Sequence, residues 1–356
     1  MLDRPTHSRV VVNARFIDQP ITGVQRFALQ ICLHLKDILP SVEFVAPRAH
    51  EGTSTSPHGL PLKRIGSLSG HAWEQISLPR YLREAGSPIL INLCNTAPIL
   101  YRNQIVTHHD ITYIRYPASF SAHFRAFYRL ITPLFLRKSH SAVTVSAFSK
   151  REICSHFKIP ESKVIVVPNA TDAQFKPAPS NQAHSPYFLA VSSPVFHKNF
   201  DRVIAAYSKL TKQSGIELRI VGSASGVFAS TRPQKLPEGV IFMGRVTDTE
   251  LVSLYSNAVG FIFPSLYEGF GIPPLEAQAC GCPVLAARIQ PFDETLGDSA
   301  CYFDPYDVDD IADCMTRVAS NPLLRSELIA RGTSNVLRYS WHRSAQLVAG
   351  LASRIV

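Results

Sequence analysis

The stretch LYEGFGIPPLEAQACGCPVLA, residues 266–286, decides the fold, because with its neighbours it reads as a strand, a loop, a helix and a second strand. The preceding run VGFIFPS, residues 259–265, is apolar and predicts a buried strand that finishes at Pro264. Pro273 and Pro274 suit the first positions of a helix, where a missing backbone N–H leaves no bond unmade. We therefore expect a short helix from near Pro274 and then a strand, as in a parallel sheet covered by helices.

Two glutamates lie on either side of the Gly-Phe-Gly turn in this unit. Glu268 is expected in the loop at the carboxyl end of the strand, and Glu276 in the first turn of the helix. Gly281 is placed to end that helix as a left-handed C-cap, before the strand at 284–287. Both carboxylates then face the crevice where open parallel sheets bind ligands. From the spacing alone, the alternative is that Glu268 is a surface residue and Glu276 a charge favoured by the helix dipole.

The Gly-Phe-Gly turn itself suggests a ligand. Backbone amides at Gly269, Phe270 and Gly271, with the helix N-terminus behind them, favour an anion such as phosphate. A carboxylate repels phosphate, so the two glutamates are expected to meet hydroxyl groups instead. A ligand with phosphates in the middle and hydroxyls at both ends is a nucleotide sugar.

The rest of the chain repeats this pattern of strands and helices in two halves. At 356 residues the chain is long enough for two domains, and in both halves apolar runs alternate with helical patterns. This predicts an α/β protein with two parallel sheets. The expected parts are a first domain at 1–174, a Pro- and Ser-rich linker at 175–186, a second domain at 187–338, and a C-terminal helix at 339–356 that can pack back on the first domain.

Composition excludes several classes of protein. Hydrophobic content of 46% and charged content of 18% describe a folded globular chain. A run of 18 or more uncharged apolar residues is absent, so a spanning helix is not expected, and the N-terminus enters a strand without an apolar signal core. Seven cysteines with scattered spacing are typical of reduced thiols. These features predict a cytoplasmic protein.

The net charge of +9 is concentrated in one region. Between Tyr113 and Pro160 there are eight Lys or Arg residues, one acid, Glu152, and many aromatic residues. Basic and aromatic residues on a helix fit an anionic membrane surface or a nucleic acid. Without a recognisable nucleic-acid module the membrane is favoured, which predicts peripheral association with the inner face of the cytoplasmic membrane. The alternative is that the aromatic residues are core and the basic ones merely solvated.

Further polar residues follow predicted strands. Gly23 opens a helix shortly after the first strand. The loop around it is either a phosphate- or substrate-binding loop or an ordinary tight turn. His109 and Asp110 end the strand QIVTHHD, where titratable groups are costly unless solvated or used. Lys198 lies after a strand and before a helix, where it can neutralise a diphosphate. The sequence Asp307-Val-Asp309 is either a metal motif or a helix start with acids in the first turn.

Taken together, these pieces resemble the retaining glycosyltransferases of family 4, which have the B-type fold of two facing Rossmann-like domains, an interdomain cleft and a C-terminal crossover helix. The resemblance covers nearly the whole chain, and PSLYEGFGIPPLEAQACGCPV is its most specific part. The other matching segments are the Gly23 loop, THHDITYIRYP (107–117), TVSAFSKREI (144–153) and KVIVVPNATDAQFKP (163–177).

The resemblance implies that the second domain holds a nucleotide sugar and the first domain an acceptor. By that match Glu268 contacts the hydroxyls of the transferred sugar and Glu276 the ribose. Lys198 neutralises the diphosphate, and His109 lies beside the donor sugar at the reaction centre. The segment FMGRVTDTEL resembles the part that contacts the base, and it points to Arg245-Val246.

Two positions depart from the family pattern. Ser193 occupies the position of a usual Arg, and Ala170 that of a usual Gly. Without the Arg, donor binding relies on Lys198, the backbone amides and the polar groups of Ser193 and its neighbours. We still expect activity.

The implied activity is retaining transfer of a hexose, mannose or rhamnose, to a glycan acceptor linked to polyprenyl diphosphate, in O-antigen or exopolysaccharide assembly. A GDP-sugar is the favoured donor, and neither a cofactor, a metal nor a nucleic acid is expected. Two alternatives stay open: an isomerase or phosphorylase of the same fold, and a non-catalytic member that binds a nucleotide sugar. Nucleoside diphosphate release only in the presence of an acceptor separates the transferase from both.

Overall fold

The computed structural model describes residues 9–48, 56, 58–179, 185–192, 195–210, 215–222 and 236–355. The chain divides into two compact units. Unit 1 comprises Met1–Ile111, Ala122–Asn169 and Ser340–Val356, and unit 2 comprises Thr112–Ser121 and Ala170–Tyr339. Unit 2 therefore includes residues 112–121 and 170–174 of the range expected for the first domain, and Tyr339 of the expected C-terminal helix. Of the expected linker, residues 180–184 lie outside the described residues.

Unit 1 is built on a seven-stranded sheet in the order β3-β2-β1-β4-β5-β6-β7, and every pair of neighbours is parallel. The inner strands β1, β4 and β5 are buried along their whole length, as short apolar runs covered on both faces should be. The strands are β1 (Val10–Asn13), β2 (Glu43–Pro47), β3 (Leu62–Ile65), β4 (Ile89–Asn92), β5 (Gln104–Thr107), β6 (Ser141–Thr144) and β7 (Val164–Val166).

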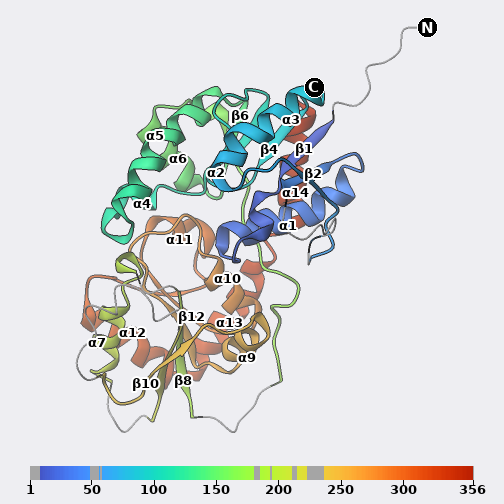
Figure 1. The fold of residues 1–356 in the computed structure, drawn as a ribbon. Coiled ribbons are helices and arrows are strands. Elements are labelled where there is room, and N and C mark those ends of the chain that lie inside the picture. The colour runs from blue at the N-terminus through green and yellow to red at the C-terminus, as the bar shows by residue number, and fades with distance from the viewer. Residues whose placement is uncertain are drawn as a thin grey trace. The chain divides into compact units, whose positions relative to one another are not determined.

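Helices connect and cover these strands (Figure 1). The C-terminal helix α14 packs against α1, and the rings of Phe27 and Trp341 meet with centroids 6.0 Å apart. The helices of unit 1 are η1 (Arg15–Asp18), α1 (Gly23–Ile38), α2 (Gly70–Ala72), the π-helix η2 (Trp73–Ser77), α3 (Leu78–Glu84), α5 (Ala122–Lys138), α6 (Ala147–Phe157), η4 (Glu161–Lys163) and α14 (Trp341–Ser353).

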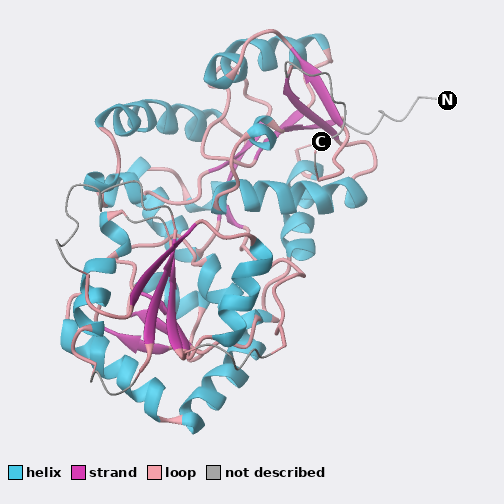
Figure 2. Ribbon diagram, turned by 60° about the horizontal axis from the view of Figure 1, so that its bottom comes forward, coloured by secondary structure: helices cyan, strands magenta, loops and turns pink. Residues whose placement is uncertain are grey.

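Unit 2 repeats the architecture with a six-stranded sheet in the order β10-β9-β8-β11-β12-β13, again parallel throughout. Figure 2 shows its strands with helices around them. The strands are β8 (Tyr187–Val191), β9 (Glu217–Val221), β10 (Val240–Gly244), β11 (Gly260–Phe263), β12 (Val284–Ala287) and β13 (Cys301–Phe303).

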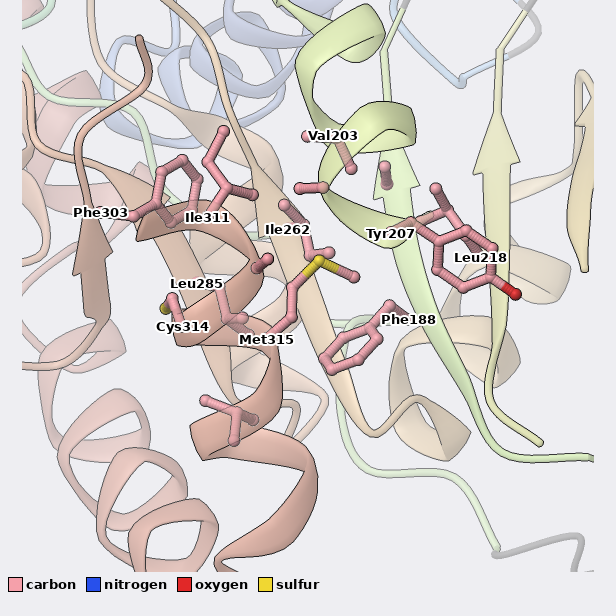
Figure 3. Close-up of a cluster of buried hydrophobic side chains, with 14 of the residues drawn as sticks. Phe188, Val203, Tyr207, Leu218, Ile262, Leu285, Phe303, Ile311, Cys314 and Met315 are labelled. Carbon is pink, nitrogen blue, oxygen red and sulfur yellow. The ribbon is translucent and has the colours of Figure 1, made fainter. Parts of the chain in front are cut away.

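The core of unit 2 lies between its sheet and helices α7 and α12 (Figure 3). Phe188, Ile262 and Leu285 from three strands meet Val203 of α7 and Met315 of α12. The helices of unit 2 are α4 (Thr112–Arg115), η3 (Pro117–Ser119), η5 (Phe196–Lys198), α7 (Phe200–Tyr207), α9 (Asp248–Asn257), α10 (Ile272–Ala279), α11 (Gln290–Thr295), α12 (Val308–Ser320) and α13 (Pro322–Val336).

Two doubly wound parallel sheets confirm the predicted fold class. One local prediction is wrong: α10 begins at Ile272, so Glu276 lies beyond the first turn. The chain can start the helix early because Gly271 adopts φ 97°, a left-handed conformation that glycine accepts without strain. Gly281 has φ 74°, as a left-handed glycine after the helix should. Within the described ranges, no helix combines the length and apolar character that crossing a bilayer requires.

Candidate functional site

The candidate donor site lies in unit 2, at the point where its strand order reverses. The chain builds the sheet in one direction from β8 to β10 and then returns to the other side of β8 with β11. Ligands of open α/β sheets bind beyond the carboxyl ends of the strands at such a switch point. The loop after β8 carries Lys198, and the loop after β11 carries Glu268.

Asn199 holds Lys198 in place. It starts α7 with φ 59°, a left-handed conformation that asparagine tolerates better than most residues. Its side-chain amide donates hydrogen bonds to the carbonyls of Pro264, at 3.1 Å, and Pro305, at 2.7 Å. The residue after Lys198 thus ties its loop to the ends of β11 and β13.

Lys198 and Glu268 form an ion pair, with Nζ 2.5 Å from Oε1. Both side chains are mostly buried, with 17% and 15% of their surface exposed. The ammonium also lies 5.7 Å from the centre of the Phe263 ring. The pair places a cation suited to phosphate beside a carboxylate suited to hydroxyls, which are the two functions that the sequence assigned to these residues.

The Gly-Phe-Gly turn leads directly into α10. A Cβ on Gly271 would lie 2.8 Å from Cε1 of Phe292, so both the space and the backbone conformation require glycine there. Among the described residues no side chain caps the helix N-terminus, and because Pro273 and Pro274 have no N–H, the backbone donors here come from Ile272 and the preceding turn. Phe270 is buried beside Gly269, and its ring packs edge-on against Tyr339 at 5.3 Å between centroids.

Glu276 is a buried carboxylate on α10, with 5% of its surface exposed. A buried carboxylate is costly unless charges or hydrogen bonds stabilise it. This burial favours a binding or structural role over the alternative of a solvated charge that serves the helix dipole.

A segment from the first half of the sequence completes the surroundings of Lys198. The hydroxyl of Ser119 lies 2.8 Å from Nδ1 of His197, and the Tyr116 hydroxyl lies 3.3 Å from the carbonyl oxygen of Leu266. Burial, assisted by the charge of Lys198, lowers the pKa of His197 to about 4, so its imidazole is neutral at pH 7. Sequence reasoning missed these contacts, because Ser119 and His197 are far apart in the chain and no local pattern links them.

His109 belongs to unit 1, after β5. Its Nε2 lies 3.1 Å from the carbonyl oxygen of Leu93, and its backbone N–H donates to Asn95 Oδ1 at 2.8 Å. Burial lowers the pKa of His109, although the Leu93 carbonyl and the Asp110 charge oppose that shift. A carbonyl only accepts, so Nε2 carries the proton and Nδ1 of the neutral ring is left as an acceptor.

The Gly23 loop is connected to His109 through helix α1. Gly23 is the first residue of that helix, and Thr22 provides no side-chain cap. Four residues later, the ring of Phe27 meets the His109 ring edge-on, with centroids 4.9 Å apart. Helix α1 therefore carries both Gly23 and the aromatic neighbour of His109.

The other predicted residues occupy the edges of unit 2 or lie outside the described residues. Arg245 is exposed and Val246 half-buried, just after β10. Ser193 lies outside the described residues. Asp307 is the N-cap of α12 and accepts hydrogen bonds from the amides of Asp309 and Asp310, which confirms the helix-start interpretation of these acids.

The fold and the residues at the switch point of unit 2 define a glycosyltransferase of the B-type fold. Residues 21–175 match the sequence model of Glycosyltransferase Family 4, and residues 172–335 match that of Glycosyl transferases group 1. Together these matches span most of the chain, which belongs to this family of glycosyltransferases.

Several relatives are named as mannosyltransferases, two of them of the O-antigen chain. The chain is 25% identical over 355 residues to the O-antigen chain mannosyltransferase RfbU of Salmonella typhimurium (strain LT2), covering 95% of this chain and 98% of that protein. It is 29% identical over 215 residues to the O-antigen chain mannosyltransferase B of Escherichia coli, covering 56% of each. It is 28% identical over 259 residues to the serotype-specific mannosyltransferase WbdA of Escherichia coli, covering 65% of this chain but only 31% of that protein.

Solved structures share the fold at low sequence identity. WaaG, a glycosyltransferase involved in lipopolysaccharide biosynthesis, aligns with a TM-score of 0.74 at 15% identity, over 96% of this chain and 99% of that one. Sucrose-phosphate synthase from Thermosynechococcus elongatus aligns with a TM-score of 0.74 at 17% identity, over 98% of this chain and 99% of that one.

Proposed function

We propose that this glycosyltransferase moves mannose, with retention of the anomeric configuration, from a nucleotide-diphosphate sugar to a hydroxyl of a lipid-linked glycan in O-antigen assembly. The favoured donor is a GDP-sugar, and the reaction needs neither a metal nor a cofactor. The choice of sugar and pathway rests on the relatives named as O-antigen mannosyltransferases. The observation that carries the chemistry is the ion pair of Lys198 and Glu268 at the switch point of unit 2.

In the proposed reaction, the bond between the anomeric carbon and the β-phosphate oxygen breaks. Negative charge develops on the leaving diphosphate, where Lys198 and the N-terminus of α10 stabilise it, which is the role a metal ion plays in other transferases. The acceptor oxygen forms the new bond on the same face of the sugar, and its proton passes to the leaving phosphate oxygen. Glu268 holds hydroxyls of the transferred sugar, and Nδ1 of the neutral His109 accepts a hydrogen bond from a sugar hydroxyl.

Nucleotide selection in the proposal falls to the remaining residues of unit 2. Glu276 accepts hydrogen bonds from the ribose hydroxyls, and Arg245 with Val246 contacts the base. Ser193 replaces the usual Arg of the family. Lys198 is therefore the cationic side chain that we assign to the diphosphate. We expect this to make donor binding sensitive to ionic strength.

Helix α5 supports the lipid part of the proposal. Three of its apolar side chains are exposed, Phe124 at 38%, Leu130 at 68% and Leu134 at 36%. Arg125 and Arg129 lie on the same helix. Exposed apolar groups beside arginines suit the interface of an anionic membrane, where they bury in the headgroup region.

Product analysis tests the proposed reaction. GDP-mannose is incubated with membranes that contain lipid-linked glycans, with and without EDTA, and the new linkage is assigned by NMR. The proposal expects GDP release that requires the acceptor, an α-linked product and unchanged activity in EDTA. A β-linked product refutes retention, and loss of activity in EDTA that Mg²⁺ restores refutes metal independence.

Vesicle co-sedimentation tests the membrane surface separately. The wild type should bind vesicles that contain phosphatidylglycerol at low salt, and Leu130→Glu with Arg129→Glu should reduce that binding at least tenfold. An unchanged affinity of the double variant for these vesicles contradicts the role of α5.

A further inference from the structure

A buried carboxylate in unit 1 is not explained by the fold or by the donor site. Glu74 has 1% of its surface exposed and belongs to the π-helical turn η2. π-helical turns within α-helices are rare and occur frequently at functional sites. Glu74 therefore occupies a position where an unusual backbone and a buried charge coincide.

The two carboxylate oxygens of Glu74 have different surroundings. Oε1 accepts hydrogen bonds from Asn13 Nδ2 at 2.9 Å and from the Thr96 hydroxyl at 3.1 Å, and Arg15 Nε lies 3.5 Å away. Oε2 is buried and makes no hydrogen bond within the described part of the chain. The nearby imidazole nitrogen Nδ1 of His71 is 3.5 Å from Oε2, too far for a good hydrogen bond.

The Glu74 carboxylate lies at the switch point of the unit 1 sheet, which its Oε1 reaches through Asn13. The sheet order β3-β2-β1-β4-β5 reverses between β1 and β4. Asn13, the last residue of β1, donates to Oδ1 of Asn92, the last residue of β4, at 3.0 Å. The Glu74 cluster is thus located in unit 1 where Lys198 is located in unit 2, at the position where such sheets bind ligands.

A small cavity adjoins the carboxylate. It is lined by Asn13, Arg15, Gln19, Glu74 and Cys94, among others, and has a volume of about 10 Å³. That volume accommodates about one water molecule or hydroxyl group. The Arg15 guanidinium already balances the carboxylate charge, so an uncharged hydroxyl donor fits better than a cation or an anion.

The electrostatics agree with an ionised acceptor. Burial alone raises the pKa of Glu74, but the His71 imidazole, the Arg15 charge and the hydrogen bonds of Asn13 and Thr96 together lower it below its usual value. An ionised carboxylate accepts hydrogen bonds more strongly than a neutral group. Oε2 is therefore a strong acceptor that makes no hydrogen bond within the described part of the chain, and its neighbour His71 Nδ1 stays 3.5 Å away.

We propose that Glu74, with Asn13 and Arg15, forms the binding site for a hydroxyl group of the acceptor sugar in unit 1. This inference rests on the proposed function, because it assigns the acceptor of that reaction. The ligand class is a neutral pyranoside whose hydroxyl enters the cavity and donates to Oε2. Glu74, Asn13 and Arg15 all belong to unit 1.

Glu74→Gln is a sharp test, because the amide oxygen can keep the bonds of Oε1 while the amide nitrogen replaces Oε2. Binding of octyl glycosides of mannose, galactose, rhamnose and N-acetylglucosamine is measured by saturation-transfer NMR on the full chain. The exposed Glu84→Gln, at the end of helix α3, is the matched control. We expect at least one glycoside to bind the wild type and the control, with about tenfold weaker binding to Glu74→Gln, because the amide nitrogen only donates and can no longer accept the charge-assisted hydrogen bond of the sugar hydroxyl.

Monodeoxy analogues of the bound glycoside separate direct contact from a structural role. The analogue that lacks the contacted hydroxyl should bind wild type and Glu74→Gln equally, whereas the other analogues keep the tenfold difference. Any of three results overturns the proposal. These are an equal loss of affinity for every analogue in Glu74→Gln, no glycoside binding by the wild type, and no effect of Glu74→Gln on binding.

Transfer from GDP-mannose to the bound glycoside distinguishes this site from the proposed function. Glu74-dependent binding without transfer from any nucleotide sugar refutes the function and leaves the site standing. Transfer with the same acceptor KM in wild type and Glu74→Gln supports the function and refutes the site.

Discussion

Neutralising Glu268 should separate the two tasks of the donor site. In the free protein the ammonium of Lys198 is already paired with this carboxylate at 2.5 Å, so a diphosphate has to compete for it. Glu268→Gln removes the competing charge and leaves Lys198 to the phosphates. At the same time the variant loses the charged acceptor that we assign to the sugar hydroxyls.

The magnitude follows from the partial burial of the pair. A hydrogen bond to a charged group contributes about 1.5–3 kcal/mol, and the 15–17% exposure of these side chains lets water and salt weaken it. We therefore expect Glu268→Gln to bind the nucleoside diphosphate about fivefold more tightly, a change of about 1 kcal/mol. The corresponding nucleotide sugar should gain nothing and bind up to about tenfold more weakly, because it loses one charge-assisted bond.

Isothermal titration calorimetry measures these affinities on four proteins: wild type, Glu268→Gln, Lys198→Met and the double variant. Lys198→Met should weaken both ligands by about tenfold or more, and the double variant should show that the single effects are not additive. Equal weakening of diphosphate and nucleotide sugar in Glu268→Gln would refute the reasoning, because the carboxylate would then serve the whole site rather than the sugar.

Two further predictions concern stability. Burial lowers the pKa of His108 to about 3 and that of His197 to about 4, so the unfolded state binds more protons than the folded state below about pH 6.5. The free energy of unfolding should therefore fall as pH drops from about 6.5 to about 4, by up to about 1.4 kcal/mol per pH unit for each histidine. Denaturant titrations at several pH values measure this dependence, and His197→Asn should reduce it by the contribution of one proton. An unchanged slope of unfolding free energy against pH in His197→Asn contradicts this prediction. Asn199→Ala should cost about 2–4 kcal/mol, because the carbonyls of Pro264 and Pro305 lose their donor and alanine is strained at φ 59°, whereas Asn199→Gly should recover only the strain. Stability of Asn199→Gly equal to that of the wild type in urea would show that the hydrogen bonds contribute nothing.

The sequence predicted the sheets because their strands are short apolar runs that end in turn residues. The edge strand β3 and helices α2 and α3 were not foreseen, since Leu62–Ile65 is half polar and only its first residue is buried. Glu276 was placed in the first turn, although it lies just beyond it, because Gly271 allows α10 to begin two residues earlier, at Ile272 rather than near Pro274.

The contacts within each unit were harder to predict than the elements. The sequence placed Lys198 and Glu268 in two loops that follow strands, which a strand pattern reveals, but it did not predict their ion pair. Glu74 could not be found in this way, because it is a single acid within a helical run and its partners come from two other strand ends. The contact of Ser119 with His197 depends on a chain crossing that no local pattern encodes.

The measurement that tests the central claim most directly is a thermal-shift panel of GDP, UDP, ADP, dTDP and CMP, with their sugars, on wild type and Glu276→Ala. A ligand at about a hundred times its Kd adds roughly 2.7 kcal/mol, which raises the Tm by several degrees. The account predicts that one base, and its sugar nucleotide, stabilises the wild type, with a much smaller shift in Glu276→Ala. Absence of any shift in the wild type, or an equal shift in the variant, would contradict a nucleotide-sugar site built on α10.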